Sequence, residues 1–257
     1  MAEAAKRFVW YELMSPDVDA AKAFYSDVVG WAITDSGMPG MDYLMLNVGD
    51  QAIGGMMGLD DDSSTAGAQP GWIGYVAVDD VDASAKKVLQ AGGAVLVEPQ
   101  DIPGVGRFAN VTDPHGAVLA LFKGNLDEEP PSPAPGTPGT VGWHELYADK
   151  LDSAWAFYAE LFGWTKDEAI DMGPQGSYQL FATGDSAVGG MMARPPDRPV
   201  AFWQYYFNVA EIDTAIERVK SGGGQVTNGP MQVPGGSWII NGLDPQGMAF
   251  ALVAPKR

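Results

Sequence analysis

The sequence contains no cysteine and only two histidines among its 257 residues. The absence of cysteine excludes disulfides, thiolate metal sites and cysteine nucleophiles. No apolar run reaches the roughly 20 residues that a membrane-spanning helix needs. Residues 1–13 also lack the apolar segment of a secretory signal. A cytoplasmic location without membrane contact is therefore expected.

Basic residues are scarce as well. The chain has 15 Lys and Arg against 33 Asp and Glu, which gives a net charge of −18. A field of this sign repels phosphate backbones, so nucleic acid is not expected as a partner. The hydrophobic content of 46% and the charged content of 19% are typical of a folded globular protein.

One stretch of the sequence is present twice. Residues 10–31 read WYELMSPDVDAAKAFYSDVVGW, and residues 143–164 read WHELYADKLDSAWAFYAELFGW. Aligned without gaps, ten of the 22 positions are identical, including the Phe-Tyr pair and the closing Gly-Trp pair. Such a density of matches indicates an internal duplication. It predicts two domains of roughly 125 residues, each long enough to bury its own core.

Each half also repeats itself weakly, since DVDAA at 17–21 is followed by DVDAS at 80–84. The periodicity predicts a strand, a helix and three strands, repeated four times along the chain, which is an α+β architecture. Residues 124–140 hold five prolines and no apolar periodicity. We therefore expect domains at 1–125 and 141–257, joined by a Pro-rich linker at 126–140. Pairing of the repeated units within a half, or between halves, is left open by the sequence.

Four βαβββ units with these motifs resemble the vicinal oxygen chelate superfamily, which includes glyoxalases, bleomycin-resistance proteins and extradiol dioxygenases. The residues that carry the resemblance are 17–31, 78–93, DPHG at 113–116, FYAELFGW at 157–164 and DPQG at 244–247. The resemblance covers nearly the whole chain outside the linker. It implies two glyoxalase-like domains, each a cupped mixed sheet with helices outside and the ligand inside the cup.

The resemblance also implies a divalent metal, held by His, Glu or Gln side chains from several strands and acting as a Lewis acid. The matching positions of this sequence are Trp10 and Trp143, Ile73 and Gln204, Ala120 and Ala251, and the glycine pairs at 54–55 and 189–190. An indole only donates hydrogen bonds and cannot bind a hard cation. Only Gln204 could serve as a ligand. We therefore predict neither a metal centre nor another cofactor.

Two glutamates recur at the same place in the repeat. Side chains alternate across a strand, so Glu12 shares a face with Trp10, and Glu145 shares a face with Trp143. If the tryptophans face the cups, both carboxylates contact a ligand or act as a general base. The alternative is a structural carboxylate, held by a neighbouring donor or facing water at the end of a strand.

Aromatic and methionine side chains are predicted to line the cups, because a pocket with apolar walls and few polar points is typical of small-molecule sites. They are Trp10, Tyr43, Met57 and Tyr75 in the first half, and Trp143, Tyr178, Met192, Tyr206 and Trp238 in the second. Asn110 and Asn241 are candidates for amide contacts. The alternative is that these residues pack the core or a domain interface.

The two histidines differ between the halves. By alternation His144 is expected on the face opposite Trp143, and Tyr11 replaces it in the first half. His115 is expected to be a solvated turn residue, with Gln246 in its place in the second half. Since no serine elbow motif is present either, no nucleophilic triad is expected.

The sequence thus favours a protein similar to the bleomycin-resistance type, which binds a small apolar or aromatic molecule without a metal, as a monomer or homodimer. The alternative is a metal-dependent lyase, isomerase or dioxygenase that uses Glu12 or Glu145. In a third interpretation the chain is a regulatory or secondary-metabolism accessory protein, in which one cup is degenerate and only stabilises the other.

Overall fold

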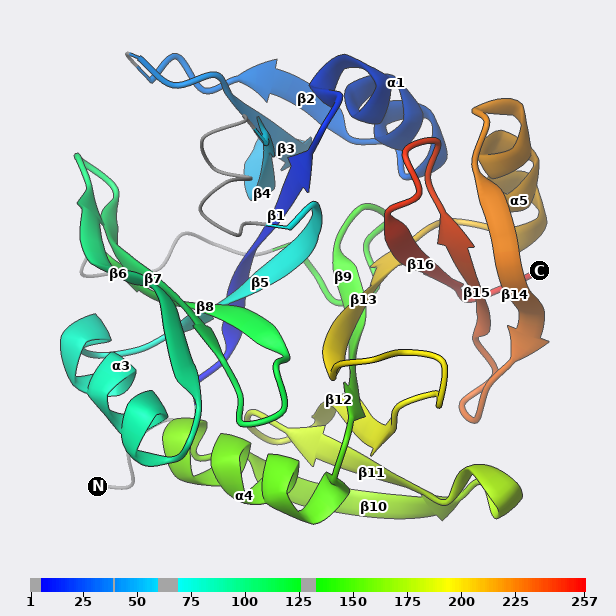
Figure 1. Cartoon of the computed structure of the whole chain (residues 1–257). Helices are drawn as coiled ribbons and strands as arrows, with labels where there is room; N and C mark the ends of the chain where they lie inside the picture. The colour runs from blue at the N-terminus through cyan, green and yellow to red at the C-terminus, as the bar shows by residue number, and fades with distance from the viewer. Residues whose placement is uncertain (1–5, 39, 60–68, 126–132) are drawn as a thin grey trace. The chain divides into compact units, whose positions relative to one another are not determined.

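The computed structural model describes residues 6–38, 40–59, 69–125 and 133–257. Four modules follow one another, each with a strand, a helix and three further strands (Figure 1). Module 1 contains β1 (Phe8–Ser15), α1 (Val18–Val28), β2 (Ala32–Asp35), β3 (Tyr43–Val48) and β4 (Gln51–Gly58). Module 2 contains β5 (Gly71–Ala77), α3 (Val81–Gln90), β6 (Ala94–Ile102), β7 (Gly106–Thr112) and β8 (Val118–Gly124). The predicted α+β architecture is confirmed.

The second half repeats the same order. Module 3 contains β9 (Val141–Ala148), α4 (Leu151–Phe162), β10 (Thr165–Asp171), the short η1 (Gly173–Gln175), β11 (Ser177–Ala182) and β12 (Ala187–Ala193). Module 4 contains β13 (Phe202–Asn208), α5 (Ile212–Ser221), β14 (Gln225–Gln232), β15 (Trp238–Leu243) and β16 (Ala249–Ala254). The insertions between the copies lie between periodic segments, where loops tolerate them.

The strands belong to two mixed sheets of eight, in the orders β2-β3-β4-β1-β5-β8-β7-β6 and β10-β11-β12-β9-β13-β16-β15-β14. Within each module, the first strand pairs in parallel with the last, and the remaining neighbours pair antiparallel. The helix after the first strand supplies the crossover that a parallel pair requires. Every module therefore has the same four-stranded topology.

The described residues group into two compact units. Unit 1 comprises residues 6–9, 73–125 and 144–203, and therefore most of modules 2 and 3. Unit 2 comprises residues 10–38, 40–59, 69–72, 133–143 and 204–257, and therefore most of modules 1 and 4. Each unit thus combines one module from each half. The expected domain boundaries at 125 and 141 stay predictions.

Helix α1 illustrates how the repeated stretch builds unit 2. Asp17 caps the helix, because its side chain accepts a hydrogen bond from the backbone N–H of Ala20 at 3.0 Å. The side chains that follow at helical spacing, including Phe24 and Tyr25, are buried. Phe24 packs edge-on against Phe250 of β16, with ring centroids 5.5 Å apart. The core of this unit therefore lies on the helix side of its sheets.

Unit 1 is built in the same way around α4. Phe157, Tyr158 and Phe162 are buried on one face of this helix. The Tyr158 ring stacks on Trp164 at 5.4 Å and meets Trp203 edge-on at 5.3 Å. Such aromatic pairs add to the energy of burial itself. The tryptophan of each GW pair and both residues of each FY pair are therefore core residues.

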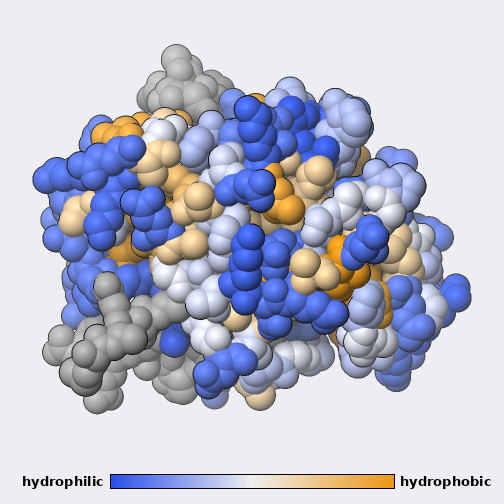
Figure 2. Space-filling model, turned by 90° about the horizontal axis from the view of Figure 1, so that it is seen from below, coloured by the Kyte–Doolittle hydropathy of each residue, from blue (hydrophilic) through white to orange (hydrophobic). Residues whose placement is uncertain are grey.

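Polar and charged side chains cover much of the face that Figure 2 shows, and apolar residues lie between them in separate small patches. This distribution is ordinary for a globular protein, in which single apolar residues at the surface need no explanation. None of the helices in the described part of the chain is long and apolar enough to cross a membrane.

Candidate functional site

A hydrogen-bonded cluster of three side chains lies on one face of the module 1 strands. The indole N–H of Trp10 donates to the hydroxyl of Tyr43 at 2.9 Å. The same hydroxyl donates to Oε2 of Glu12, also at 2.9 Å. Glu12 is buried, with 8% of its surface exposed. We call Trp10, Glu12 and Tyr43 the Glu12 cluster; all three come from β1 and β3 of unit 2.

Glycine at position 55 makes room for this cluster. Gly55 is the β4 partner of Glu12 in the parallel pairing of β1 and β4. A Cβ at Gly55 would lie within 2.1 Å of the Tyr43 ring. The Tyr43 side chain therefore lies directly over the glycine. Burial and the nearby Glu12 charge raise the pKa of the Tyr43 hydroxyl far above its ordinary value, so it stays protonated and donates a hydrogen bond to the carboxylate.

Unit 1 repeats the same arrangement in module 3. Glu145 is the β9 partner of Gly190 in β12, and Glu145 is 8% exposed. A Cβ at Gly190 would lie 2.2 Å from Cζ of Tyr178, so this ring also lies over a glycine. The half-buried Met192 follows Gly190 by two residues and shares its face. Met57 has the same place beside Tyr43 in unit 2.

Module 4 carries a second polar group, which belongs to unit 2. The Nδ2 of Asn228 donates to Oδ1 of Asn241 at 3.3 Å, and the Nδ2 of Asn241 donates to the Tyr206 hydroxyl at 3.2 Å. Gln204 is two residues before Tyr206 on β13 and is 7% exposed. Strand periodicity places Gln204 and Tyr206 on the same face. This face is therefore rich in carboxamides.

Module 2 has a more apolar counterpart in unit 1. Tyr75 of β5, Ala120 of β8 and Asn110 of β7 are neighbours across the sheet. The next residue in this row is Val97, whose side chain has no hydrogen-bonding group. Among the described residues, Oδ1 of Asn110 is buried without a hydrogen-bond partner. The Asn110 side chain, which was predicted to contact a ligand, thus has Ala120 and Val97 as its cross-strand neighbours.

The expectation for Trp238 is corrected by the register of β15. Asn241 and Trp238 are three residues apart in a regular strand, so their side chains point to opposite faces. Trp238 shares its face with the fully buried Ile240, and the Arg257 guanidinium lies 5.3 Å from its ring centroid. It therefore does not share the face of Tyr206 and Asn241. Trp143 belongs to the same β9 strand as Glu145 and is half-buried.

The positions that the resemblance assigns to metal ligands do not fit a divalent metal. Ile73, Ala120 and Ala251 are buried and apolar. No group of three or more His, Asp or Glu side chains that could hold a metal ion occurs in the described part of the chain. A hard cation requires several oxygen or imidazole ligands. The tyrosine hydroxyls over Gly55 and Gly190 occupy space beside the glutamates instead.

His144 packs in the interior of unit 1. Its ring stacks on Phe8 with centroids 4.3 Å apart, and its Nδ1 lies 2.8 Å from the carbonyl oxygen of Val188. Burial lowers the pKa of His144 to about 4, so the imidazole is neutral at physiological pH. The His144 ring is therefore part of the core packing of unit 1.

His115 is not the solvated turn residue that was expected. Its Nε2 lies 2.5 Å from Oγ of Ser153, and its Nδ1 lies 3.8 Å from Oδ2 of Asp149. The His115 side chain is 15% exposed. The sequence did not reveal this contact, because 38 residues separate His115 from Ser153. The one available signal was the replacement of His115 by Gln246 in the other copy of the turn.

The aspartates of the two DPxG turns reach the tyrosines of the FY pairs. In unit 2 the Tyr25 hydroxyl donates to Oδ2 of Asp244 at 3.2 Å, and it accepts a hydrogen bond from the Trp72 indole. In unit 1 the Tyr158 hydroxyl donates to Oδ2 of Asp113 at 3.1 Å. These repeated motifs therefore join a module of one half to a module of the other.

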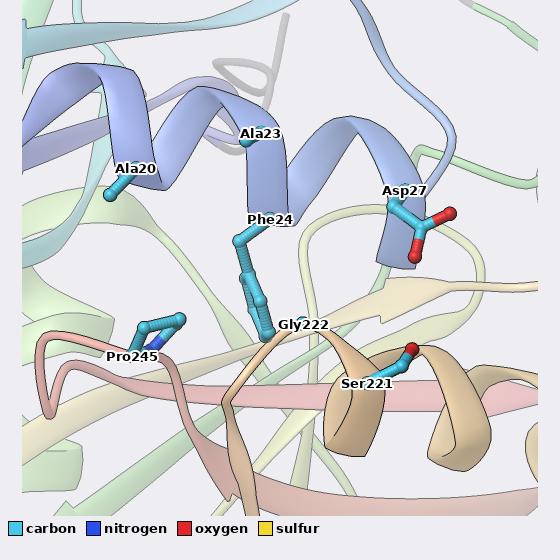
Figure 3. A pocket seen from close by; sticks show the side chains of 7 residues that line it. All are labelled: Ala20, Ala23, Phe24, Asp27, Ser221, Gly222 and Pro245. Atoms are coloured by element: carbon cyan, nitrogen blue, oxygen red, sulfur yellow. The ribbon is translucent and has the colours of Figure 1, made fainter.

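A surface hollow in unit 2 lies between α1 and the end of α5, and none of the predicted site residues lines it. Phe24 points from α1 toward Gly222, and Asp27, Ser221 and Pro245 surround the space (Figure 3). Its walls contain a single carboxylate and no histidine. The hollow has no part in the clusters described above.

Comparison with known proteins shows the family of the chain. The model of the "Glyoxalase/Bleomycin resistance protein/Dioxygenase superfamily" matches residues 7–121 and 140–252. "Putative glyoxylase CFP32" of Mycobacterium tuberculosis is 33% identical over 248 residues, which cover 96% of this chain and 94% of the relative. "Anthracycline biosynthesis protein DnrV" of Streptomyces peucetius is 32% identical over 257 residues, which cover 95% of this chain and 91% of the relative.

Solved structures show the same fold at lower identity. The Mn(II)-bound glyoxalase from Novosphingobium aromaticivorans has a TM-score of 0.65 at 17% identity, covering 98% of this chain and 82% of that one. A catechol 2,3-dioxygenase has a TM-score of 0.64 at 14% identity, covering 98% and 93%. With the family model matching both halves and relatives above 30% identity, the chain belongs to the Glyoxalase/Bleomycin resistance protein/Dioxygenase superfamily.

Proposed function

We propose that the protein binds a small, largely aromatic organic molecule on the Glu12 face of module 1 and does so without the divalent metal of its superfamily. The observation that carries this proposal is the Glu12 cluster. Trp10 and the glycine pair at 54–55 stand at positions that the resemblance assigns to metal ligands. The Tyr43 hydroxyl lies over one of these glycines and hydrogen-bonds to Glu12.

The side chains of this face suit a flat aromatic ligand. Trp10 and Tyr43 offer ring faces, which pair well with other aromatic rings at offset or edge-on geometries. Met57 is unbranched and polarizable, so it adapts to ligands of irregular outline. The carboxylate of Glu12 is held in place by Tyr43 and accepts hydrogen bonds from phenolic or amino groups. The ligand class is therefore an aromatic molecule that carries at least one donor group.

The relatives support this class of ligand. DnrV is named for anthracycline biosynthesis. We further propose that Glu145, Tyr178 and Met192 form an equivalent face in module 3, and that Trp143 lies beside them. Tyr75 with Asn110, and Tyr206 with Gln204 and Asn241, supply further polar contacts.

The binding test uses 1,4-dihydroxyanthraquinone as the probe, with tryptophan emission as the readout. We expect saturable quenching in the wild-type protein, since Trp10 adjoins the ligand. Tyr43→Phe removes the hydroxyl that orients Glu12 and weakens binding by roughly tenfold, as expected for the loss of about 1.4 kcal/mol from a charged hydrogen bond. Trp155→Phe on α4 is the control and leaves the affinity unchanged. A hydroxylated-aromatic panel without any effect on emission or melting temperature would refute the proposal.

Metal content is tested on the purified protein by elemental analysis and by titration with Mn²⁺, Fe²⁺, Ni²⁺ and Zn²⁺. We expect no stoichiometric ion, because the positions that match the metal ligands carry indole, methyl and glycine groups. One tightly bound ion per chain would instead support the alternative, a metal-dependent lyase, isomerase or dioxygenase that uses Glu12 or Glu145.

A further inference from the structure

Unit 1 brings a serine, a histidine and an aspartate together at the start of α4. Ser153 is the third residue of α4, and its Oγ lies 2.5 Å from Nε2 of His115 in the DPHG turn. On the other side of the imidazole, Nδ1 faces Oδ2 of Asp149 at 3.8 Å. The two ring nitrogens thus face a hydroxyl and a carboxylate, which is the order found in Ser-His-Asp triads. The Glu12 cluster and the polar group of module 4 do not include these residues.

The charges around the imidazole favour the tautomer that a general base needs. Asp149 is ion-paired with Arg194 at 2.7 Å. A carboxylate beside Nδ1 favours a proton on that nitrogen and leaves Nε2 as the acceptor. The Ser153 hydroxyl is also 3.2 Å from the carbonyl oxygen of Lys150, but Nε2 is the closer acceptor.

The serine is accessible, and donors for a developing oxyanion lie beside it. Ser153 is exposed. The first N–H groups of a helix have no partner within the helix, and the positive end of its dipole favours negative charge there. Lys150, at the N-cap, supplies no side-chain cap to these groups. A tetrahedral intermediate formed on Ser153 would therefore lie beside the N–H groups of the first turn of α4.

The corresponding place in unit 2 lacks a base. Gln246 replaces His115, and its Oε1 accepts a hydrogen bond from Oγ of Ser15 at 2.5 Å. A carboxamide cannot take up the serine proton at neutral pH. Ser15 is also fully buried. The two turns therefore share a serine contact, but only the turn of unit 1 pairs an exposed hydroxyl with an imidazole.

We propose that Ser153, with His115 as general base, is an acyl-transfer site that hydrolyses small carboxylic esters. Oγ of Ser153 attacks the ester carbonyl carbon as its proton passes to Nε2 of His115. The C–O bond to the leaving group then breaks, and the alkoxide takes the proton from the imidazolium. Water attacks the acyl-serine ester in the same manner, releases the carboxylic acid and restores the serine hydroxyl.

The test measures hydrolysis of p-nitrophenyl acetate by the full chain at neutral pH. We expect turnover by the wild-type protein, reduced by at least about tenfold in Ser153→Ala and in His115→Gln. The second substitution introduces the side chain found in the other unit, and the fold of each variant is checked by its melting temperature. Ser221→Ala on α5 and Gln246→Ala are matched controls with wild-type turnover. Equal rates for the wild type and folded Ser153→Ala would overturn the proposal.

Covalent labelling gives a second and independent readout. Diisopropyl fluorophosphate should phosphorylate Ser153 with loss of fluoride, and mass spectrometry of peptides should place the adduct there. Labelling should fall in His115→Gln. Asp149→Asn, a change of the positioning residue, should lower kcat and leave KM unchanged. Labelling spread evenly over exposed serines, independent of His115, would contradict an activated nucleophile.

Discussion

The two compact units share one internal contact and differ around it. Unit 2 joins Tyr25 to Asp244, and unit 1 joins Tyr158 to Asp113, at 3.2 and 3.1 Å. A tryptophan indole donates to the tyrosine hydroxyl in both units. Two residues after each aspartate, however, unit 2 has a glutamine and unit 1 has His115. The repeated motifs therefore hold the modules together in both units. The third residue of the DPxG turn, by contrast, is a carboxamide in unit 2 and an imidazole in unit 1.

The sheet faces give a second comparison. Both Tyr43 and Tyr178 lie over a glycine, so the geometry beside Glu12 and Glu145 is repeated. Modules 4 and 2 differ: the Asn241 side chain has two hydrogen-bond partners, whereas the buried Oδ1 of Asn110 has none among the described residues. A duplicated scaffold can thus present one carboxamide-rich face and one apolar face. The predictions below test which parts of the two units are equivalent.

The largest effects are expected at the first glycine of each Gly-Gly pair. A Cβ at Gly54 would lie 2.4 Å from the backbone oxygen of Tyr11, and a Cβ at Gly189 would lie 2.2 Å from that of His144. Because backbone atoms cannot move aside, each change to alanine should cost about 3 kcal/mol of unfolding free energy, measured in urea. Gly184→Ala is the control, since nothing lies near its Cβ. A cost below about 1 kcal/mol at only one of the two sites would show that Gly54 and Gly189 are not structurally equivalent.

The next effect concerns the tyrosines that reach the DPxG aspartates. Tyr158→Phe leaves the indole of Trp203 and a carboxylate oxygen of Asp113 without this partner. Since Trp203 is 7% exposed, we expect a loss of about 3 kcal/mol. Tyr25→Phe should cost about 2 kcal/mol, because its half-buried indole partner is closer to water. Urea unfolding measures both; the reverse order would contradict the explanation.

A smaller effect is expected in the pH dependence of the unfolding free energy. It arises because module 3 has the titratable His144 where module 1 has Tyr11. The pKa of His144 is about 4 in the fold, whereas an unfolded chain has about 6.5. Below pH 6.5 unfolding therefore takes up a proton, and the free energy of unfolding falls as the pH drops toward 4. The wild type should lose about 2 kcal/mol more than His144→Tyr between pH 7 and pH 5.

The control for this measurement is Gln246→Ala, which removes no titratable group, leaves the interior imidazole in place and should keep the wild-type pH dependence. The position of the titration is checked by NMR of the imidazole. A midpoint of the His144 imidazole near 6.5 would show that burial does not suppress its charge.

The smallest effect concerns the side-chain caps at the helix N-termini, which α1 and α3 of the first half have and α4 of the second half lacks. Asp17 and Asp80 accept hydrogen bonds from first-turn N–H groups of α1 and α3 at 3.0 and 2.9 Å. Changing either to alanine should cost about 1 kcal/mol in thermal or urea unfolding. Lys150 supplies no side-chain cap to α4, so Lys150→Ala should change stability by less than about 0.5 kcal/mol. Equal losses at all three positions would argue against capping as the cause.

Much of the fold follows from local patterns. The Asp cap and apolar spacing of 17–29 predict α1, and the alternation at 43–48 predicts β3, because both signals arise within one element. Strand β6 continues through Glu98 and Pro99 to Ile102, beyond its β-branched start at 94–97. It lies at the edge of its sheet, where Pro99 needs no ladder partner for its nitrogen. Propensity alone underestimates such a strand.

The site is less predictable because its contacts join distant residues. Alternation along β1 places Glu12 with Trp10, but only the pairing of β3 and β4 places Tyr43 over Gly55. The contact of His115 with Ser153 depends on the packing of a turn of module 2 against a helix of module 3. The misassignment of Trp238 has a simpler cause, since it ignored the odd spacing from Asn241. Register, rather than residue type, decided these cases.

The crosswise grouping of modules has a consequence for the integrity of the molecule. A single backbone cut between residues 125 and 133 would yield two fragments, and each compact unit contains parts of both. The buried links of Tyr25 with Asp244 and of Tyr158 with Asp113 would each become intermolecular. The nicked protein would thus persist as a heterodimer on dilution and come apart only in denaturant.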